Sequence, residues 1–322
     1  MWILLLVIVL LSCTGAVLLF MMACARGGGP LGRLLPSLLH TDGNPIDEFS
    51  DAIERGKEWF AQQKWEDLRI ESHDGLRLHG YFLAHPQPER AILCVHGYHG
   101  SPQRDFAGAL AEFYAAGSSL LVVDQRAHGL SEGRYISFGA LERHDVRRWA
   151  EALDKRLGGA LPIVLDGISM GASTVLMAGS EPMPASVSGV IADCGYTTPK
   201  EELTHVVRNM LHVRPFPAVQ IVLLLARCIG GFSLSRASAK QGAAGWGEVP
   251  VLFVHGLADT FVPSYMSEEN FKACLPPKDI YLVEGAEHGL SYLIDREGVR
   301  TKLGHLFRAA EHYYHKKHAK DT

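Results

Sequence analysis

The chain has 322 residues, of which 47% are hydrophobic and 20% charged, and it carries a formal net charge of −4 at pH 7. This length can form one large domain or two, and the apolar content is sufficient for a sizeable buried core. The slightly acidic balance, without basic blocks or interleaved aromatic and basic residues, excludes a typical nucleic-acid-binding surface.

The first segment, residues 2–24, contains no charged residue and is dominated by Leu, Val, Ile, Phe and Met. About 20 such residues suffice to cross a bilayer as a helix, so residues 1–24 are predicted to form a single-pass membrane anchor. A cleaved signal segment is the alternative, although the positively charged start of a signal peptide is missing. Arg26 and Arg33 follow the segment and predict, by the positive-inside rule, that the rest of the chain lies on the cytoplasmic side.

Residues 25–64 are predicted to form a linker and a short helix. The Gly-Gly-Gly-Pro run at residues 27–30 has little capacity to pack, whereas residues 45–63 contain apolar residues at helical spacing. Residues 65–70 and 76–83 are expected to be two paired strands, joined by a His-Asp-Gly turn.

A Gly-Ile-Ser-Met-Gly pentapeptide at residues 167–171 directly follows the apolar run 163–165. A strand that leads into this pattern, and then into a helix of small residues, is typical of the nucleophile elbow of a serine hydrolase. In such an elbow the hydroxyl of Ser169 stands clear of the sheet. Side chains at Gly167 and Gly171 would collide with the adjacent strand and helix.

An acid and a histidine follow two later apolar runs, in the order that this chemistry requires. Asp259 comes after residues 251–254, and His288 comes after residues 280–283. Both lie just beyond the carboxyl ends of predicted strands, at the edge where open α/β sheets bind ligands. The sequence therefore predicts a catalytic triad of Ser169, Asp259 and His288.

Two further features complete the predicted site. The loop His-Gly-Tyr-His-Gly-Ser follows the apolar run 91–95, where such a fold supplies a backbone N–H to the oxyanion hole. We expect the hole to consist of the N–H groups of Tyr98 and Met170, with His99 as a candidate substrate contact. Asp193, which ends another apolar run, is the alternative triad acid.

Five segments together resemble the α/β-hydrolase superfamily, in its esterase/lipase and serine-aminopeptidase-like branch. They are H-G-Y-H-G-S, D-Q-R-A-H-G-L-S-E-G, G-I-S-M-G, H-G-L-A-D-T-F-V-P and G-A-E-H-G, and they occur in the family's order between residues 68 and 316. One departure is Ala127, where many relatives have Gly. The resemblance implies an α/β-hydrolase fold over residues 65–322, with a mostly parallel, doubly wound sheet, helices on both faces and a helical lid inserted at about residues 196–247.

Residues 218–229 within this lid are strongly apolar but too short to span a membrane. We expect a helix that is buried against the core. A lid helix that walls the acyl pocket or touches lipid is the alternative.

The predicted chemistry is acyl transfer to Ser169, with His288 as general base and Asp259 orienting the imidazole. The sequence therefore predicts hydrolysis of carboxylic esters, lipid-like esters among them, with a small-molecule acyl substrate. It implies no metal, no organic cofactor and no nucleic-acid partner, and leaves the oligomeric state open. A serine aminopeptidase or amidase is the alternative, because the same triad serves amides. A catalytically silent, membrane-tethered binding protein is the alternative of a different class.

Overall fold

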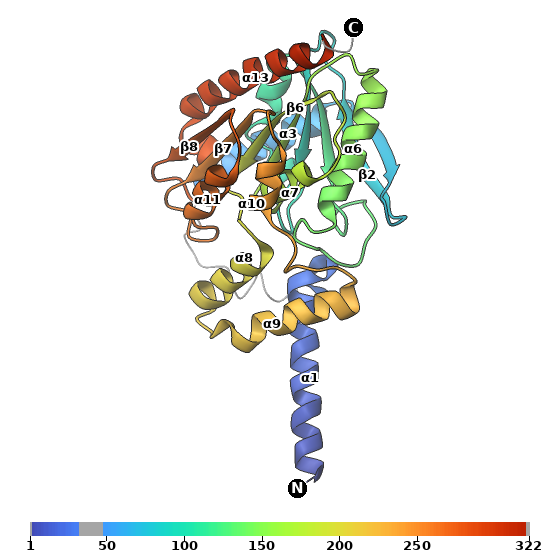
Figure 1. Ribbon diagram of the computed structural model, residues 1–322, viewed down its shortest axis with the longest axis vertical. Coiled ribbons are helices and arrows are strands. Elements are labelled where there is room, and N and C mark those ends of the chain that lie inside the picture. The colour runs from blue at the N-terminus through green and yellow to red at the C-terminus, as the bar shows by residue number, and fades with distance from the viewer. Residues whose placement is uncertain (1, 32–47, 320–322) are drawn as a thin grey trace.

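An eight-stranded sheet forms the centre of the molecule in the computed structural model, which describes residues 2–31 and 48–319 (Figure 1). The strand order is β1-β2-β4-β3-β5-β6-β7-β8. β2 runs antiparallel to both β1 and β4, and all other neighbouring strands are parallel. The strands are β1 (Glu66–Glu71), β2 (Arg77–Leu83), β3 (Arg90–Val95), β4 (Ser118–Asp124), β5 (Ile163–Ile168), β6 (Val187–Asp193), β7 (Val251–Gly256) and β8 (Lys278–Val283). The predicted mostly parallel sheet is confirmed.

The sequences of the central strands follow from their burial. Every residue of β3, β4 and β7 is buried, because parallel strands are covered on both faces and are therefore continuous apolar runs. The edge strand β1 instead alternates between exposed and half-buried residues. β3 lies between β4 and β5, so the chain reverses its direction of travel across the sheet there. Loops diverge at such a switch point and leave a crevice beyond the strand ends.

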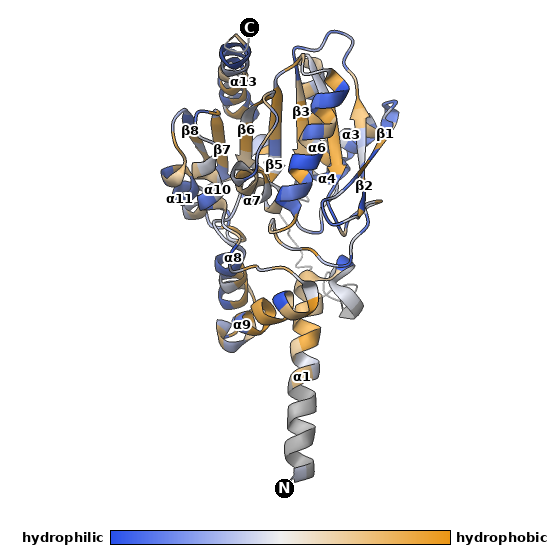
Figure 2. Ribbon diagram, turned by 45° about the vertical axis from the view of Figure 1, so that its right-hand side comes forward, coloured by the Kyte–Doolittle hydropathy of each residue, from blue (hydrophilic) through white to orange (hydrophobic). Residues whose placement is uncertain are grey.

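Helices cover both faces of the sheet, and Figure 2 shows the hydrophobic strands between helices that carry hydrophilic residues. Alternate strand residues divide between two apolar clusters, so that Leu93 contacts one helical layer and Ile92 the other. The first layer contains α6 (Glu142–Leu157), α7 (Met170–Met177), α10 (Ala239–Gly245) and α11 (Tyr265–Ala273). The second contains α3 (Ser50–Gln62), α5 (Leu110–Ala115) and α13 (Arg296–His318), with the short α4 (Pro102–Asp105) and α12 (Ser291–Ile294) beside them.

The helical insertion predicted between two strands lies between β6 and β7. It contains α8 (Pro199–His205), η4 (Val206–Met210), α9 (Pro215–Leu225), η5 (Ala226–Gly230) and α10. α9 and η5 cover the apolar run 218–229. Val219 and Val222 are buried, whereas Leu224 is 59% exposed. The run therefore packs against the protein on one side only, and the expected burial is confirmed for that side.

The N-terminal helix α1 (Trp2–Cys24) projects from the body of the molecule, and its C-terminal end is packed into it (Figure 1). Phe20 and Cys24 are fully buried in the core. The hydroxyl of Tyr98 donates hydrogen bonds to the carbonyl oxygens of Met22 and Ala23, at 3.1 and 2.9 Å. The last turn of α1 is therefore part of the main domain.

This packing changes the interpretation of the N-terminus. Across residues 2–31 and 48–319, no helix combines the length and hydropathy needed to cross a bilayer, and the single-pass anchor predicted for residues 1–24 is not supported. The sequence-based prediction treated this segment as independent of the main domain, whereas the contacts of Phe20 tie it to the core. Of the predicted linker and helix, residues 32–47 lie outside the described residues, and the helix is observed as α3.

Replacing Phe20 by Ala is expected to lower the free energy of unfolding by about 3–5 kcal/mol, the usual cost of deleting a buried Phe side chain. Thermal unfolding of the full chain measures this effect. Val17→Ala is the matched control, since Val17 lies on the same helix and is 41% exposed. Equal melting temperatures for Phe20→Ala and the control would show that α1 does not pack as described.

Candidate active site

Ser169 lies at the turn between β5 and α7, with a φ of 58° and a ψ of −118°. A non-glycine residue in such a conformation costs about 1–3 kcal/mol and persists where the surrounding structure enforces it. The two flanking glycines show what enforces it. A Cβ at Gly167 would lie 2.3 Å from the carbonyl oxygen of Gly171, and a Cβ at Gly171 would lie 1.9 Å from the carbonyl oxygen of Val95 on β3. Only glycine lets α7 approach both strands this closely.

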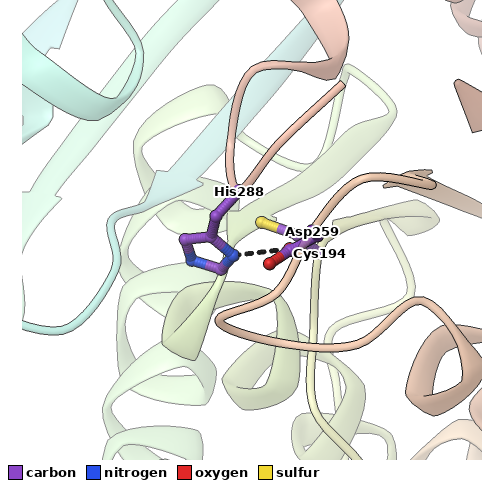
Figure 3. A group of neighbouring side chains, drawn as sticks. All are labelled: Cys194, Asp259 and His288. Atoms are coloured by element: carbon purple, nitrogen blue, oxygen red, sulfur yellow. Dashed lines mark hydrogen bonds and ion pairs between the residues drawn. The ribbon is translucent and has the colours of Figure 1, made fainter. Parts of the chain in front are cut away.

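His288 lies in the loop after β8 and forms hydrogen bonds through both ring nitrogens. Its Nε2 lies 2.9 Å from Oγ of Ser169, and its Nδ1 lies 2.7 Å from Oδ2 of Asp259. Figure 3 shows the imidazole directed at the Asp259 carboxylate. Because Asp259 accepts, the proton belongs on Nδ1, which leaves Nε2 free to accept the serine proton. The structure thus brings together three residues from the ends of β5, β7 and β8.

The Asp259 side chain is completely buried and fully hydrogen-bonded. Its Oδ1 accepts from the backbone N–H groups of Phe261 and Val262, both at 2.9 Å, while Oδ2 faces His288 and His255. Burial raises the pKa of this carboxyl, but the hydrogen bonds from His255 and His288 outweigh burial and bring the pKa to about 2. Asp259 is therefore an anion at neutral pH.

His255, at the end of β7, is a residue to which the sequence analysis gave no role. Its Nδ1 lies 2.6 Å from Oγ of Ser267, and its Nε2 lies 3.1 Å from Oδ2 of Asp259. When the Ser267 hydroxyl donates to Nδ1, the proton on Nε2 is shared between the Val262 carbonyl oxygen at 2.8 Å and Asp259, so His255 ties the carboxylate to the loop that follows it. The sequence pattern that could have identified this residue is H-G-L-A-D, in which His255 stands four residues before Asp259.

Asp193, the alternative acid, ends β6 close to the same histidine. No hydrogen bond joins it to His288 in the described part of the chain, and its Oδ1 is buried without a partner there. Burial raises the pKa of Asp193 to about 6. Asp259, by contrast, is hydrogen-bonded to Nδ1 of His288 at 2.7 Å, so the geometry favours Asp259 as the triad acid.

The loop after β3 passes directly beside the elbow, since a Cβ at Gly97 would lie 3.2 Å from Cβ of Ser169. The Gly97 N–H donates to Oδ2 of Asp105 at 2.8 Å, and the His99 N–H donates to Nε2 of His128 at 3.1 Å. These two bonds fix the loop on either side of Tyr98.

The two N–H groups predicted to form the oxyanion hole are both available. The Tyr98 N–H has no hydrogen-bond acceptor among the described residues. Met170 is the first residue of α7, where the N–H groups of a helix have no partner within the helix. His99 lies elsewhere: its ring is exposed, packs on the Tyr98 ring at 4.1 Å between centroids, and does not line the cavity beside Ser169.

A cavity of about 280 Å³ opens beside Ser169 and extends along the face of the sheet that α13 covers. Most of its wall is apolar, and the residues are Ile53, Phe106, Phe113, Ile168, Ile191, Val254, Leu290, Leu293, Val299 and Leu303. No described residue of the insertion 196–247 lines it. The hypothesis that the apolar lid helix walls the acyl pocket is therefore wrong for this cavity, because the pocket lies between the sheet and the opposite helical layer.

Three potential metal ligands lie close together at this site. Ligand atoms of Cys194, Asp259 and His288 lie within 4.8 Å of one another (Figure 3). Both nitrogens of His288 are already engaged by Asp259 and Ser169. Burial raises the pKa of the Cys194 thiol well above its usual value, which disfavours the thiolate that binds metals. The donor set therefore fits a hydrogen-bonded triad better than a metal site.

Comparison with known proteins finds similarity both in sequence and in structure. Residues 86–225 match the family model of the S33 serine aminopeptidases. The uncharacterized protein YqkD of Bacillus subtilis (strain 168) is 28% identical over 249 residues, which cover 76% of this chain and 80% of YqkD. The esterase Pf2001 of Pyrococcus furiosus has a similar structure, with a TM-score of 0.61 and 18% identity over 76% of this chain and 90% of the esterase. The α/β hydrolase GrgF of Penicillium sp. sh18 has a TM-score of 0.59 and 15% identity, and the match covers 78% of this chain and 99% of GrgF.

At these identities the structural neighbours establish the fold, and the family model covers the segment that holds the oxyanion loop and Ser169. The sheet order and the helical insertion agree with that assignment. The chain therefore has the α/β-hydrolase fold, and its residues 86–225 are similar to the S33 serine aminopeptidases.

Proposed function

We propose that this protein hydrolyses carboxylic esters through an acyl-enzyme intermediate, with Ser169 as nucleophile, His288 as general base and Asp259 as the triad acid. The observation that carries the proposal is the continuous hydrogen-bonded chain from Oγ of Ser169 through His288 to the buried Asp259 carboxylate. A serine hydroxyl is a weak nucleophile until an adjacent base takes its proton, and this chain supplies the base.

The proposed reaction proceeds in two halves. Oγ of Ser169 attacks the acyl carbon while its proton passes to Nε2 of His288, and the N–H groups of Tyr98 and Met170 stabilise the negative oxygen that forms. His288 then protonates the leaving alcohol, and the acyl group remains on the serine. In the second half His288 takes a proton from water, the resulting nucleophile attacks the acyl-enzyme, and the free acid leaves.

Two observations support esters over amides. The wall of the cavity beside Ser169 is largely apolar, which suits the hydrocarbon part of an ester. One structurally similar protein is an esterase. Amide cleavage by a serine aminopeptidase is the second candidate function, because the matching family model bears that description.

A substrate panel separates these two activities. We expect the full chain to hydrolyse p-nitrophenyl esters, and to hydrolyse aminoacyl p-nitroanilides no faster than the Ser169→Ala variant does. Faster, Ser169-dependent turnover of the anilides, with esters left at background, would assign amide cleavage instead. No Ser169-dependent turnover of either class would favour the silent binding protein.

A further inference from the structure

Two of the acidic side chains that line the cavity beside Ser169 have no part in the proposed reaction. Asp166 lies on β5 and Asp193 at the end of β6, and both line the cavity. In the parallel pairing of these strands Asp166 lies opposite Ile191, and Ile168 lies opposite Asp193. The two acids are therefore diagonal neighbours on one face of the sheet, the face that α13 covers.

Neither carboxyl has all of its oxygens paired within the described residues. Asp166 is only 4% exposed, yet it makes no hydrogen bond or ion pair with any described residue. Oδ1 of Asp193 is likewise buried without a partner in that part of the chain. Asp145, a buried acid in α6 on the opposite side of the sheet, shows the contrast, since it forms an ion pair with Arg126 at 2.6 Å. Burying an unpaired carboxyl costs folding free energy, whereas an apolar residue at the same place would not.

The charge state of the pair follows from its surroundings. Burial, and then the nearby charge of Asp193, raise the pKa of Asp166 well above its usual value. The surroundings therefore favour the protonated form of Asp166, while Asp193, with its pKa of about 6, is largely ionised at neutral pH. Together they offer a negative charge and several acceptor oxygens to a ligand.

The two acids lie at different distances from the nucleophile: Asp193 is next to it, since its backbone oxygen accepts from the Ser169 N–H at 2.8 Å, and Asp166 lies farther along the sheet. Asp166 precedes Ser169 by three residues of an extended strand, which corresponds to about 10 Å at roughly 3.3 Å per residue. Ile168, Ile191 and Val254 line the wall of the same cavity. A chain attached at Ser169 that extends along this wall thus passes Asp193 before it reaches Asp166.

We propose that Asp166 and Asp193 bind a hydrogen-bond donor, a hydroxyl or an ammonium group, at the far end of the substrate's acyl chain. The inference rests on the proposed function, because Ser169 fixes the position of the acyl carbon. A site whose buried polar groups need a partner rejects an analogue that lacks the donor, since binding that analogue leaves those groups unpaired. The preferred esters are therefore those of acids with a polar terminus, and simple fatty esters are poorer substrates.

The test compares p-nitrophenyl esters of equal chain length that end in a methyl, a hydroxyl or an ammonium group. For the full chain we expect kcat/KM to be about tenfold to hundredfold higher for a donor-terminated ester than for its methyl-terminated match, the range for a hydrogen bond to a charged group. The preference should appear only once the chain is long enough to reach Asp166. The two kcat/KM values are compared within each protein variant, so that a smaller fraction of active enzyme lowers both values equally and leaves their ratio unchanged.

Two variants locate the effect. Asp166→Val should remove the donor preference and should not lower the melting temperature, because it replaces an unpaired buried carboxyl by a residue suited to a strand. Asp193→Asn should reduce the preference for the ammonium ester and largely spare that for the hydroxyl ester, since an amide oxygen still accepts. Val164→Ala is the matched control: Val164 lies two residues from Asp166 on the same face of β5, outside the cavity lining, and the ratio should not change.

A wild-type ratio that favours the methyl ester at every chain length would overturn the inference, as would a donor preference that survives Asp166→Val. A lower melting temperature of Asp166→Val with an unchanged ratio would assign the acids a purely structural role. Each of these results leaves the proposed function standing as long as Ser169→Ala abolishes turnover of all three esters. Turnover that persists in Ser169→Ala would instead refute the proposed function.

Discussion

Replacing Ser169 by Ala is expected to reduce kcat for ester hydrolysis by about 10⁶-fold, the effect of removing the triad serine in other hydrolases. Without the hydroxyl there is no acyl acceptor, and only the oxyanion donors and substrate binding remain to assist attack by water. The fold should persist, because the conformational strain at this positive φ is similar for Ala and Ser, and the substitution removes only the hydrogen bond to His288. Kinetics with p-nitrophenyl esters, together with thermal unfolding, measure both expectations.

Ser173→Ala is the control for this substitution. Ser173 lies on the same helix, one turn after the elbow, and its buried hydroxyl donates to the carbonyl oxygen of Tyr196 at 3.0 Å. We expect this variant to lose some stability and to retain its kcat. Equal kinetic losses in the two variants would indicate that damage to α7, rather than loss of the nucleophile, explains the effect at Ser169.

Asp259→Asn is expected to lower kcat by about 10⁴-fold, as the corresponding change does in another triad enzyme. The amide oxygen can still accept from the N–H groups of Phe261 and Val262, so the loop should keep its shape. The amide nitrogen then faces Nδ1 of His288 and donates to it, which stabilises the tautomer that carries its proton on Nε2. In that tautomer the imidazole cannot accept the serine proton.

The same measurement on Asp193→Asn discriminates between the two acids. Asp193 makes no hydrogen bond to His288 in the described chain, so the kcat of Asp193→Asn on short esters should fall far less than that of Asp259→Asn. A larger loss in Asp193→Asn than in Asp259→Asn would mean that the acid at the end of β6 completes the triad.

The features that local sequence determines are the ones that the sequence analysis predicted. The continuous apolar runs of β3 and β7 follow from burial on both faces of a parallel sheet, and such runs are visible in one dimension. The elbow glycines at residues 167 and 171 could also be predicted from the sequence, because the close approach of α7 to β5 and β3 leaves no room for a Cβ. Ser169, Asp259 and His288 each follow an apolar run, which predicted their positions at the carboxyl ends of strands, and the structure brings them together there.

The features that depend on tertiary packing were not predictable in this way. A helix that is apolar on all sides, like α1, carries no periodic signal of which residues dock, so the burial of Phe20 was missed. Asp166 sits within an apolar run, and only the pairing of β5 with β6 shows that it lies on the same face as Asp193. The position of the cavity on the α13 side, away from the insertion, likewise depends on which helices cover which face.

The most direct test of the account is active-site labelling of the full chain with a fluorophosphonate, followed by mass spectrometry of its peptides. A fluorophosphonate reacts with a serine that an adjacent base has activated, and its phosphoryl oxygen occupies the place of the oxyanion. We predict one adduct, on Ser169, that is lost in Ser169→Ala and strongly slowed in Asp259→Asn. Labelling at a different serine, or an unmodified Ser169 in protein that hydrolyses esters, would contradict the assignment of Ser169, His288 and Asp259 as the catalytic triad.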